Sequence, residues 1–302
     1  GGPRRFGPEL SFGRAVADGM PGERVAVLKA CGGGTNILEH WERGVAPDPD
    51  YPEKSQLYHA LLGSLDTATY PELAYPAEVT RLDSALSRLT ARGDTYRIAA
   101  VVWLQGENEA GWSAAYTYEE HLRGFIADLR SDLGEPALPF VMTKLSLNAA
   151  ATNGGQLPDA GVAAVRDAQT SVAATDPAIA LVDVDDVAPD EPGGLHFTSE
   201  GYLTIGERLG AAYLALESGA GGGATSSSGS ASSGGGGEPS ATASGSSASS
   251  GVGGAGGGSG AEDDAGGGCS AAGQGDRAAT GWSAALALAI AFRRRRRAAE
   301  RA

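Results

Sequence analysis

Short apolar runs alternate with amphipathic segments along roughly the first 217 residues of the chain. Four runs, at residues 25–30, 98–104, 139–145 and 179–184, are predicted to be strands of a sheet interior. The run at 98–104 is rich in β-branched and aliphatic residues without polar alternation, which is typical of a central strand covered on both faces.

The segments between these runs carry large apolar residues at a spacing of three to four positions, as amphipathic helices do. The four predicted helix faces are Val79, Leu82, Leu86 and Leu89; Leu122, Phe125, Ile126, Leu129 and Leu133; Val162, Val165, Ala168, Gln169 and Val172; and Tyr202, Ile205, Leu209, Ala212 and Tyr213. Thr198 or Ser199 is the expected N-cap of the last helix. This alternation predicts a three-layer α/β/α sandwich around a parallel sheet, within a domain spanning residues 1–217.

The sequence changes character at about residue 218, where Gly, Ser and Ala replace nearly all larger side chains. Such a composition buries too little apolar surface to offset the entropy of ordering, so residues 218–268 are predicted to be a disordered linker. The last part, 269–302, contains an apolar run at 282–292 followed by five arginines. That run is shorter than the roughly 20 residues of a membrane-spanning helix. Two interpretations stay open: a hydrophobic end with a basic tail, or a short membrane segment held by its arginines.

The formal net charge of −14 argues against nucleic acid as the main partner, because binding a phosphate backbone requires a basic face. The only two cysteines, Cys31 and Cys269, are far apart in the sequence and do not indicate a disulfide pair. Cysteines and histidines do not show the spacing of a zinc site.

Polar groups follow directly after the predicted strand at 98–104, in the sequence Gln105-Gly-Glu107-Asn108. The carboxyl ends of strands in open α/β sheets border the ligand crevice, so these side chains are expected to face it. An amide there could donate a hydrogen bond to a developing negative charge.

Two further segments are candidates for chemistry. His196 lies in a loop just before the last predicted helix, a suitable position for a general base. Three glycines at 32–34 follow the first predicted strand, and they lack the spacing of a dinucleotide-binding motif. They allow either a close approach of backbone N–H groups to a ligand or simply a tight turn.

Several motifs occur in a characteristic order: Phe-Gly-Pro-Glu-Leu-Ser-Phe-Gly-Arg at 6–14, a Gly-Gly-Thr turn at 33–35 followed by Trp41, Trp-Leu-Gln-Gly-Glu-Asn at 103–108, and His-Phe-Thr-Ser-Glu-Gly-Tyr at 196–202. In this order they resemble the sialic-acid-specific acetylesterases, a group of carbohydrate esterases within the SGNH hydrolase superfamily. The resemblance covers about residues 6–216 and implies a flavodoxin-like SGNH hydrolase fold.

The resemblance implies a serine hydrolase, which needs neither a metal nor an organic cofactor, and it also implies roles for individual residues. His196 matches the catalytic histidine, and Gly33 or Gly34 matches the backbone donor of an oxyanion hole. Asn108 takes the place of a further donor. Gln105, Glu107 and Trp41 are expected to line the substrate pocket, which would bind an acetylated carbohydrate.

The sequence departs from the family pattern at two points. The family's serine nucleophile belongs to a first strand that would precede Gly1, so we expect a chain that is truncated there, lacks that strand and is inactive by itself. The strands at 25–30 and 98–104 should then flank a gap or pair directly. Family members usually have an aspartate three residues before the histidine, but this chain has Gly193 there. Asp190 is therefore a weak candidate, together with Glu191, for the residue that orients His196.

The tail, with Gly-Gly-Gly-Cys-Ser at 266–270, an apolar run and five arginines, resembles the C-terminal sorting tail of myxobacterial surface proteins. This implies a bacterial protein that is exported, processed near Cys269 by a sorting protease, and attached to the cell surface or outer membrane through membrane contact of the tail. The leading hypothesis is an exported carbohydrate acetylesterase. The alternatives are a catalytically inactive, surface-anchored carbohydrate-binding relative and a lipase-like esterase of the same superfamily.

Overall fold

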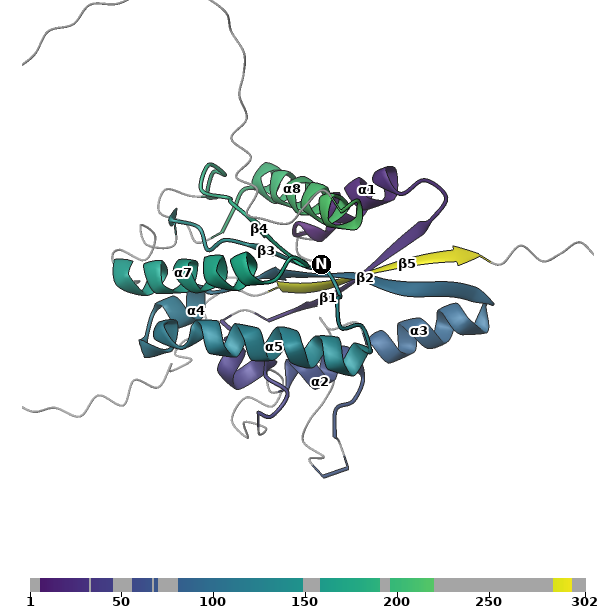
Figure 1. Ribbon diagram of the computed structural model, residues 1–302, viewed down its shortest axis with the longest axis horizontal. Helices are drawn as coiled ribbons and strands as arrows, with labels where there is room; N and C mark the ends of the chain where they lie inside the picture. The colour runs from purple at the N-terminus through teal and green to yellow at the C-terminus, as the bar shows by residue number, and fades with distance from the viewer. Residues whose placement is uncertain are drawn as a thin grey trace, which may run out of the picture. The chain divides into compact units, whose positions relative to one another are not determined.

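A five-stranded sheet runs through the middle of the protein, with strand order β1-β5-β2-β3-β4 (Figure 1). The computed structural model describes residues 6–32, 34–45, 56–66, 68–69, 81–148, 158–190, 196–219 and 285–294. The strands are β1 (Arg24–Cys31), β2 (Asp94–Leu104), β3 (Phe140–Thr143), β4 (Ile179–Val182) and β5 (Ala285–Arg294). β2, β3 and β4 pair in parallel, which confirms the predicted α/β fold with a parallel sheet.

Helices cover both faces of this sheet, as the alternating sequence pattern predicted (Figure 1). The helices are α1 (Glu9–Gly19), α2 (Leu57–Leu62), α3 (Leu82–Ala91), α4 (Glu107–Ala110), α5 (Tyr118–Leu133), α7 (Asp159–Thr175) and α8 (Ser199–Glu217), with shorter helical turns at Ile37–Trp41 and Ser113–Tyr116. α1 and α8 lie on one face, and α3, α5 and α7 lie on the other. Thr198 caps α8 as predicted, because its side chain accepts a hydrogen bond from the Gly201 N–H. Val79, predicted on the α3 face, lies outside the described residues.

β2 separates two hydrophobic cores, and its side chains alternate between them. Val101 and Trp103 belong to the core under α5 and α7, whereas Ala100 and Val102 belong to the core under α1 and α8. This alternation within the apolar part of β2, residues 98–104, is typical of a strand that is buried on both faces. β2 therefore places its carboxyl end, Leu104, at the centre of the sheet edge.

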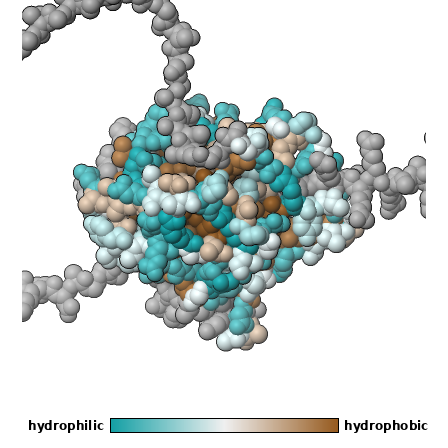
Figure 2. All heavy atoms as spheres, in the orientation of Figure 1, coloured by the Kyte–Doolittle hydropathy of each residue, from teal (hydrophilic) through white to brown (hydrophobic). Residues whose placement is uncertain are grey.

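Polar residues cover most of the surface, interrupted by small apolar areas on the face seen in Figure 2. Among the described residues, the exposed large apolar side chains are Phe6, Leu10, Tyr96, Trp112, Tyr116 and Leu147. The described helices include none that is both long enough and apolar enough to cross a bilayer. The predicted linker, beyond Gly219, and Cys269 lie outside the described residues.

The expectation of a gap or a direct pairing between β1 and β2 is wrong, because β5 occupies that position. β5 runs antiparallel to both neighbours, and Ala289 pairs with Val27 of β1 and with Ala100 of β2. β1 and β2 are thus parallel to each other across an antiparallel strand. The sequence at 285–292 alternates alanine with Leu, Leu, Ile and Phe, a period of two that is typical of a strand. The prediction for this run rested on its length and its arginines and did not include this alternation.

A close helix contact on the α1–α8 face yields a stability prediction. A Cβ atom on Gly206 of α8 would lie 2.1 Å from the Pro8 carbonyl oxygen and 2.8 Å from the Phe12 nitrogen. We expect Gly206→Ala to lower the free energy of unfolding by about 2 kcal/mol or more, because backbone atoms of α1 would have to move. Gly124→Ala in α5 is the control, since its Cβ would meet nothing within 4 Å and should stabilise the helix slightly. Urea unfolding of both variants measures the difference; equal stabilities would contradict the packing.

Candidate active site

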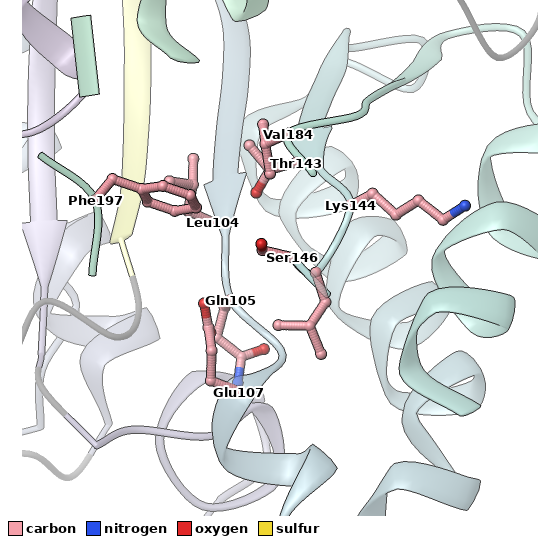
Figure 3. A pocket seen from close by; sticks show the side chains of 9 residues that line it. Leu104, Gln105, Glu107, Thr143, Lys144, Ser146, Val184 and Phe197 are labelled. Carbon is pink, nitrogen blue, oxygen red and sulfur yellow. The ribbon is translucent and has the colours of Figure 1, made fainter. Parts of the chain in front are cut away.

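A small pocket opens at the carboxyl edge of the sheet, where strands β2, β3 and β4 end (Figure 3). Its lining consists of Leu104, Gln105, Glu107, Thr143, Lys144, Leu145, Ser146, Val184 and Phe197. Apolar walls thus surround a few polar groups, the usual composition of a ligand site. The cavity measures about 20 Å³, room for about one water molecule or a group of similar size.

Gln105 contributes to the site mainly as part of a buried hydrogen-bond network. Its side chain is only 2% exposed. Its amide nitrogen donates to the Thr35 carbonyl oxygen, at 3.4 Å, and to the Glu109 carboxylate. Its amide oxygen lies 3.0 Å from the Tyr118 hydroxyl, which can donate to it. These bonds connect the end of β2 to the turn after β1 and to α5.

Glu109 is a central residue that the sequence analysis did not single out. It is fully buried, and one carboxylate oxygen accepts a hydrogen bond of 2.6 Å from the Ile37 N–H. The other oxygen accepts from the Gln105 amide. Burial raises the pKa of the carboxyl, although these two donors favour its charged form. The sequence signal that could have pointed to Glu109 is its position in a short segment that directly follows a buried strand.

Asn108 and Gly34 are joined directly. The Asn108 amide nitrogen donates to the Gly34 carbonyl oxygen at 2.9 Å, and its oxygen accepts from the Trp112 indole N–H at 3.2 Å. Gly34 has a φ of +68°, a conformation that favours glycine. The structure therefore brings together two of the residues predicted for the oxyanion hole, while Gly33 lies outside the described residues. One N–H of the Asn108 amide is used by the Gly34 carbonyl, which leaves the second for a ligand.

Trp41 corrects a prediction, because it does not line the pocket. Its side chain is fully buried and packs edge-to-face against Trp103, with ring centroids 5.4 Å apart. Its indole N–H donates to the Thr35 hydroxyl at 3.1 Å. A tryptophan side chain buries more apolar surface in the core than it could in a cavity of this size. Trp41 therefore supports the Thr35 turn from the core side.

Glu107 provides a carboxyl group at the pocket. Its Oε2 atom is buried and has no hydrogen-bond partner among the described residues. Burial raises the pKa of this carboxyl to about 7, and the neighbouring Glu109 carboxylate adds to the rise. Gly106 precedes it with a φ of +143°, and a Cβ there would lie 2.8 Å from Val165. Near neutral pH, the Glu107 carboxyl can therefore donate a proton or a hydrogen bond to a ligand.

The raised pKa of Glu107 predicts a pH-dependent stability. The folded state holds the proton to about pH 7, whereas the unfolded chain releases it near the ordinary value of 4.5. The neutral form thus stabilises the fold fully below pH 4.5, and this contribution is lost as the pH rises through 7. Relative to Glu107→Gln, we expect the wild type to lose about 3 kcal/mol of unfolding free energy between pH 4 and pH 8. Urea unfolding across that range measures it, with Glu120→Gln as an exposed control; parallel curves for wild type and Glu107→Gln would refute it.

His196 reaches the same edge of the sheet through a short paired loop. The Asp190 N–H donates to the His196 carbonyl oxygen at 2.8 Å, and Pro189 and Phe197 form an adjacent β-bridge. Phe197 lines the pocket, so the residue next to His196 borders the same cavity as Glu107 (Figure 3). Asp190 contacts His196 through backbone atoms; a carboxylate–imidazole hydrogen bond is not formed among the described residues. Glu191 and Gly193 lie outside them.

Comparison with known proteins identifies the family of the chain. The sequence pattern of the family described as "Carbohydrate esterase, sialic acid-specific acetylesterase" matches residues 3–215. The chain belongs to this carbohydrate esterase family. Among solved structures, a protein from Arabidopsis thaliana is similar, with 25% sequence identity over 70% of this chain and 68% of the other and a TM-score of 0.44. A search of curated proteins returned no match.

Ser146, which lines the pocket, and Gln169, which lies behind it, were not predicted as site residues. The Ser146 side chain faces the cavity, and its hydroxyl oxygen accepts a hydrogen bond from the Asn148 N–H at 3.1 Å, so its proton is available to a ligand (Figure 3). Gln169, predicted only as part of a helix face, is fully buried. It accepts from the Leu145 N–H at 2.8 Å and donates to the Gln105 carbonyl at 3.2 Å, joining the ends of β2 and β3.

Clusters of three or more metal-binding side chains do not occur among the described residues. The polar groups at the pocket are carboxyl, amide, hydroxyl and ammonium groups. Such groups can bind a polar ligand by hydrogen bonds and can move protons.

Proposed function

We propose that this domain acts in a carbohydrate O-acetylesterase that hydrolyses acetyl esters on sugars by a serine–histidine mechanism. Membership of the family supports an ester hydrolase of the carbohydrate class. One structural observation supports the finer proposal: Phe197, the neighbour of His196 in sequence, lines the same small, largely apolar pocket as Gln105 and Glu107. A pocket of this size suits the methyl group of an acetyl ester, and the sugar would remain outside it.

The proposed chemistry needs only groups that move protons and stabilise an anion. A serine hydroxyl, which we expect to precede Gly1, gives its proton to His196 as its oxygen attacks the acetyl carbonyl carbon. Backbone N–H groups of the turn at Gly34 and the second N–H of the Asn108 amide stabilise the resulting oxyanion. His196 then protonates the departing sugar oxygen, and water hydrolyses the acetyl-serine by the same route, releasing acetate.

Glu107 adds a hydrogen-bond donor to the proposed site near neutral pH. Because its carboxyl is protonated up to about pH 7, it can donate a hydrogen bond to a ligand oxygen in the pocket. Asp190 remains a weak candidate for orienting His196, because the contact between the two is made by backbone atoms.

The experiment is a measurement of acetate release. The product of the full reading frame and the 302-residue chain are each incubated with O-acetylated sialic acid, acetylated xylan and, as a comparison, a long-chain fatty ester. We expect release from the acetylated sugars by the full product, little from the fatty ester, and none from the 302-residue chain. Binding of acetylated sugar by the full product without any release would favour the inactive carbohydrate-binding alternative. Preference for the fatty ester would favour a lipase-like esterase.

Export, processing near Cys269 and attachment to a bacterial surface stay predictions from the tail sequence. Cys269 lies outside the described residues, and residues 285–294 are part of the sheet. Membrane contact through this run would therefore require it to leave the sheet.

A further inference from the structure

We propose, on the basis of the esterase function above, that the Trp112 indole is the surface on which the sugar ring of the substrate stacks, next to the acetyl-binding cavity. Trp112 lies between α4 and the helical turn Ser113–Tyr116, and it is not part of the cavity lining. It binds the sugar and takes no part in the chemical step.

Trp112 is a large aromatic residue at the surface of the domain. It is 42% exposed, whereas Trp41 and Trp103 are fully buried in the core. An exposed apolar residue is by itself common and needs no function. What distinguishes Trp112 is the way in which it is held and the residue that lies next to it.

Hydrogen bonds hold Trp112 at three points. Its backbone N–H donates to the carbonyl oxygen of the buried Glu109 at 3.1 Å, and its carbonyl oxygen accepts from the Ala115 N–H at 3.2 Å. Its indole N–H donates to the Asn108 amide oxygen at 3.2 Å. These bonds leave the face of the indole ring unused. An aromatic ring that is already fixed binds a ligand with little loss of side-chain entropy.

The indole is joined directly to the proposed oxyanion hole. Asn108 accepts from Trp112 through its amide oxygen and donates to the Gly34 carbonyl oxygen at 2.9 Å through its amide nitrogen. We have proposed that the second N–H of this amide binds the acetyl carbonyl oxygen. The oxygen that links the sugar is bonded to the same carbonyl carbon. The sugar ring therefore has to lie close to Asn108, and Trp112 is hydrogen-bonded to the same side-chain amide.

The size of the cavity places the sugar outside it. A cavity of about 20 Å³ accepts a group of about the size of a methyl and excludes a sugar ring. A pyranose ring presents C–H groups on its face, while its hydroxyls point outward from the ring edge. The face of an indole is electron-rich and attracts such C–H groups, so the two rings are complementary. Trp112 thus provides the apolar surface that the cavity does not.

The test compares two acetyl esters in the full reading-frame product: an O-acetylated sugar, and methyl acetate, which carries no ring. Trp112→Ala removes both the ring and the indole N–H, whereas Trp112→Phe keeps an aromatic ring and removes only the N–H. We expect Trp112→Ala to raise KM for the acetylated sugar about 10-fold and Trp112→Phe about threefold or less. For methyl acetate, kcat/KM should be the same in the two variants, because this ester reaches only the cavity and Asn108.

Tyr96→Ala is the matched control. Tyr96 is 40% exposed, nearly the same as Trp112, and lies in β2 near the end that is remote from Leu104 and the pocket. We expect its KM for the acetylated sugar to stay within about twofold of wild type, since substitutions away from a site have small effects.

A binding measurement keeps this proposal separate from the esterase proposal. The 302-residue chain is labelled with fluorotryptophan and titrated with O-acetylated sialic acid and with an acetylated xylan oligosaccharide, and fluorine NMR is recorded. We expect at least one of them to shift the resonance that is missing in Trp112→Phe, while those of Trp41 and Trp103 stay in place. An absence of acetate release by the full product would refute the esterase reaction, and a shift at Trp112 would still identify the sugar-binding surface.

Three results would overturn the role of Trp112. One is a Trp112→Ala variant whose KM for the acetylated sugar equals that of Tyr96→Ala, or whose kcat/KM falls by the same factor for methyl acetate, which would mean that the indole acts only by positioning Asn108. Another is a Trp112 resonance that neither sugar shifts. The last is a larger loss for a long-chain fatty ester than for the acetylated sugar, which would mean that the indole binds an acyl chain.

Discussion

His196→Ala is expected to lower kcat/KM for an acetylated sugar by more than about 10³-fold in the full reading-frame product, with little change in KM. The backbone of this residue is held by Asp190 on one side, and Thr198 caps α8 two residues later on the other. Loss of the imidazole should therefore leave the loop and the neighbouring Phe197 in place. What disappears is the imidazole itself, and with it the proton transfer from the nucleophile.

The control for this variant is His59→Ala. His59 lies in α2, and its ring bonds to the Ser64 hydroxyl and the Arg43 carbonyl oxygen. Acetate release by the control should stay within about twofold of wild type, since substitutions away from a site have small effects. Turnover in His196→Ala equal to that of the control would remove His196 from the mechanism and leave the family membership untouched.

Glu109→Ala is expected to have the largest effect on stability, a loss of about 3–5 kcal/mol of unfolding free energy. The variant would leave the Ile37 N–H and the Gln105 amide without their acceptor in a site closed to water, and it would open a cavity beside them. A typical domain is stable by about 5–15 kcal/mol, so this loss is a large share of the total. Urea unfolding followed by tryptophan fluorescence measures it, because Trp41 and Trp103 pack in the adjoining core.

Two further variants distinguish the hydrogen bonds from charge alone. Glu109→Gln keeps one acceptor oxygen and the side-chain volume, so we expect it to lose roughly half as much stability as the alanine variant. Glu120→Ala removes an exposed carboxylate in α5 and should change stability by less than about 0.5 kcal/mol. If Glu109→Ala were as stable as Glu120→Ala, Glu109 would not be the group that joins the turn after β1 to the end of β2.

Elements with a strong local period were predicted closely. The face of α7 from Val162 to Val172 is buried as expected, and the strand predicted at 98–104 forms the carboxyl-terminal part of β2. The sequence also predicted that Gln105 and Glu107 would emerge at the carboxyl end of a central strand, where they do line a pocket. Each of these predictions depends only on residues that are close together in sequence, so the spacing of residue types along the chain is enough to make it.

Burial of a polar or aromatic group was harder to predict. Trp41 follows the Gly-Gly-Thr turn of the site but points into the core against Trp103. Gln169 has the place of an apolar residue on its helix and is used to satisfy backbone groups of Gln105 and Leu145. Whether such a side chain faces a cavity or an interior depends on partners supplied by other elements, and a single sequence does not show which partners those are.

By itself the sequence determined β1 to β4, four of the helix faces, the cap of α8 and the family, because periodicity and motif order are properties of the chain. Only the tertiary structure decided that Ala285–Arg294 pairs between β1 and β2, and that Glu109 joins the two turns of the site. The physical reason is the same in both cases. A strand ladder and a buried hydrogen bond both need two segments far apart in sequence, and their free energy exists only once those segments meet.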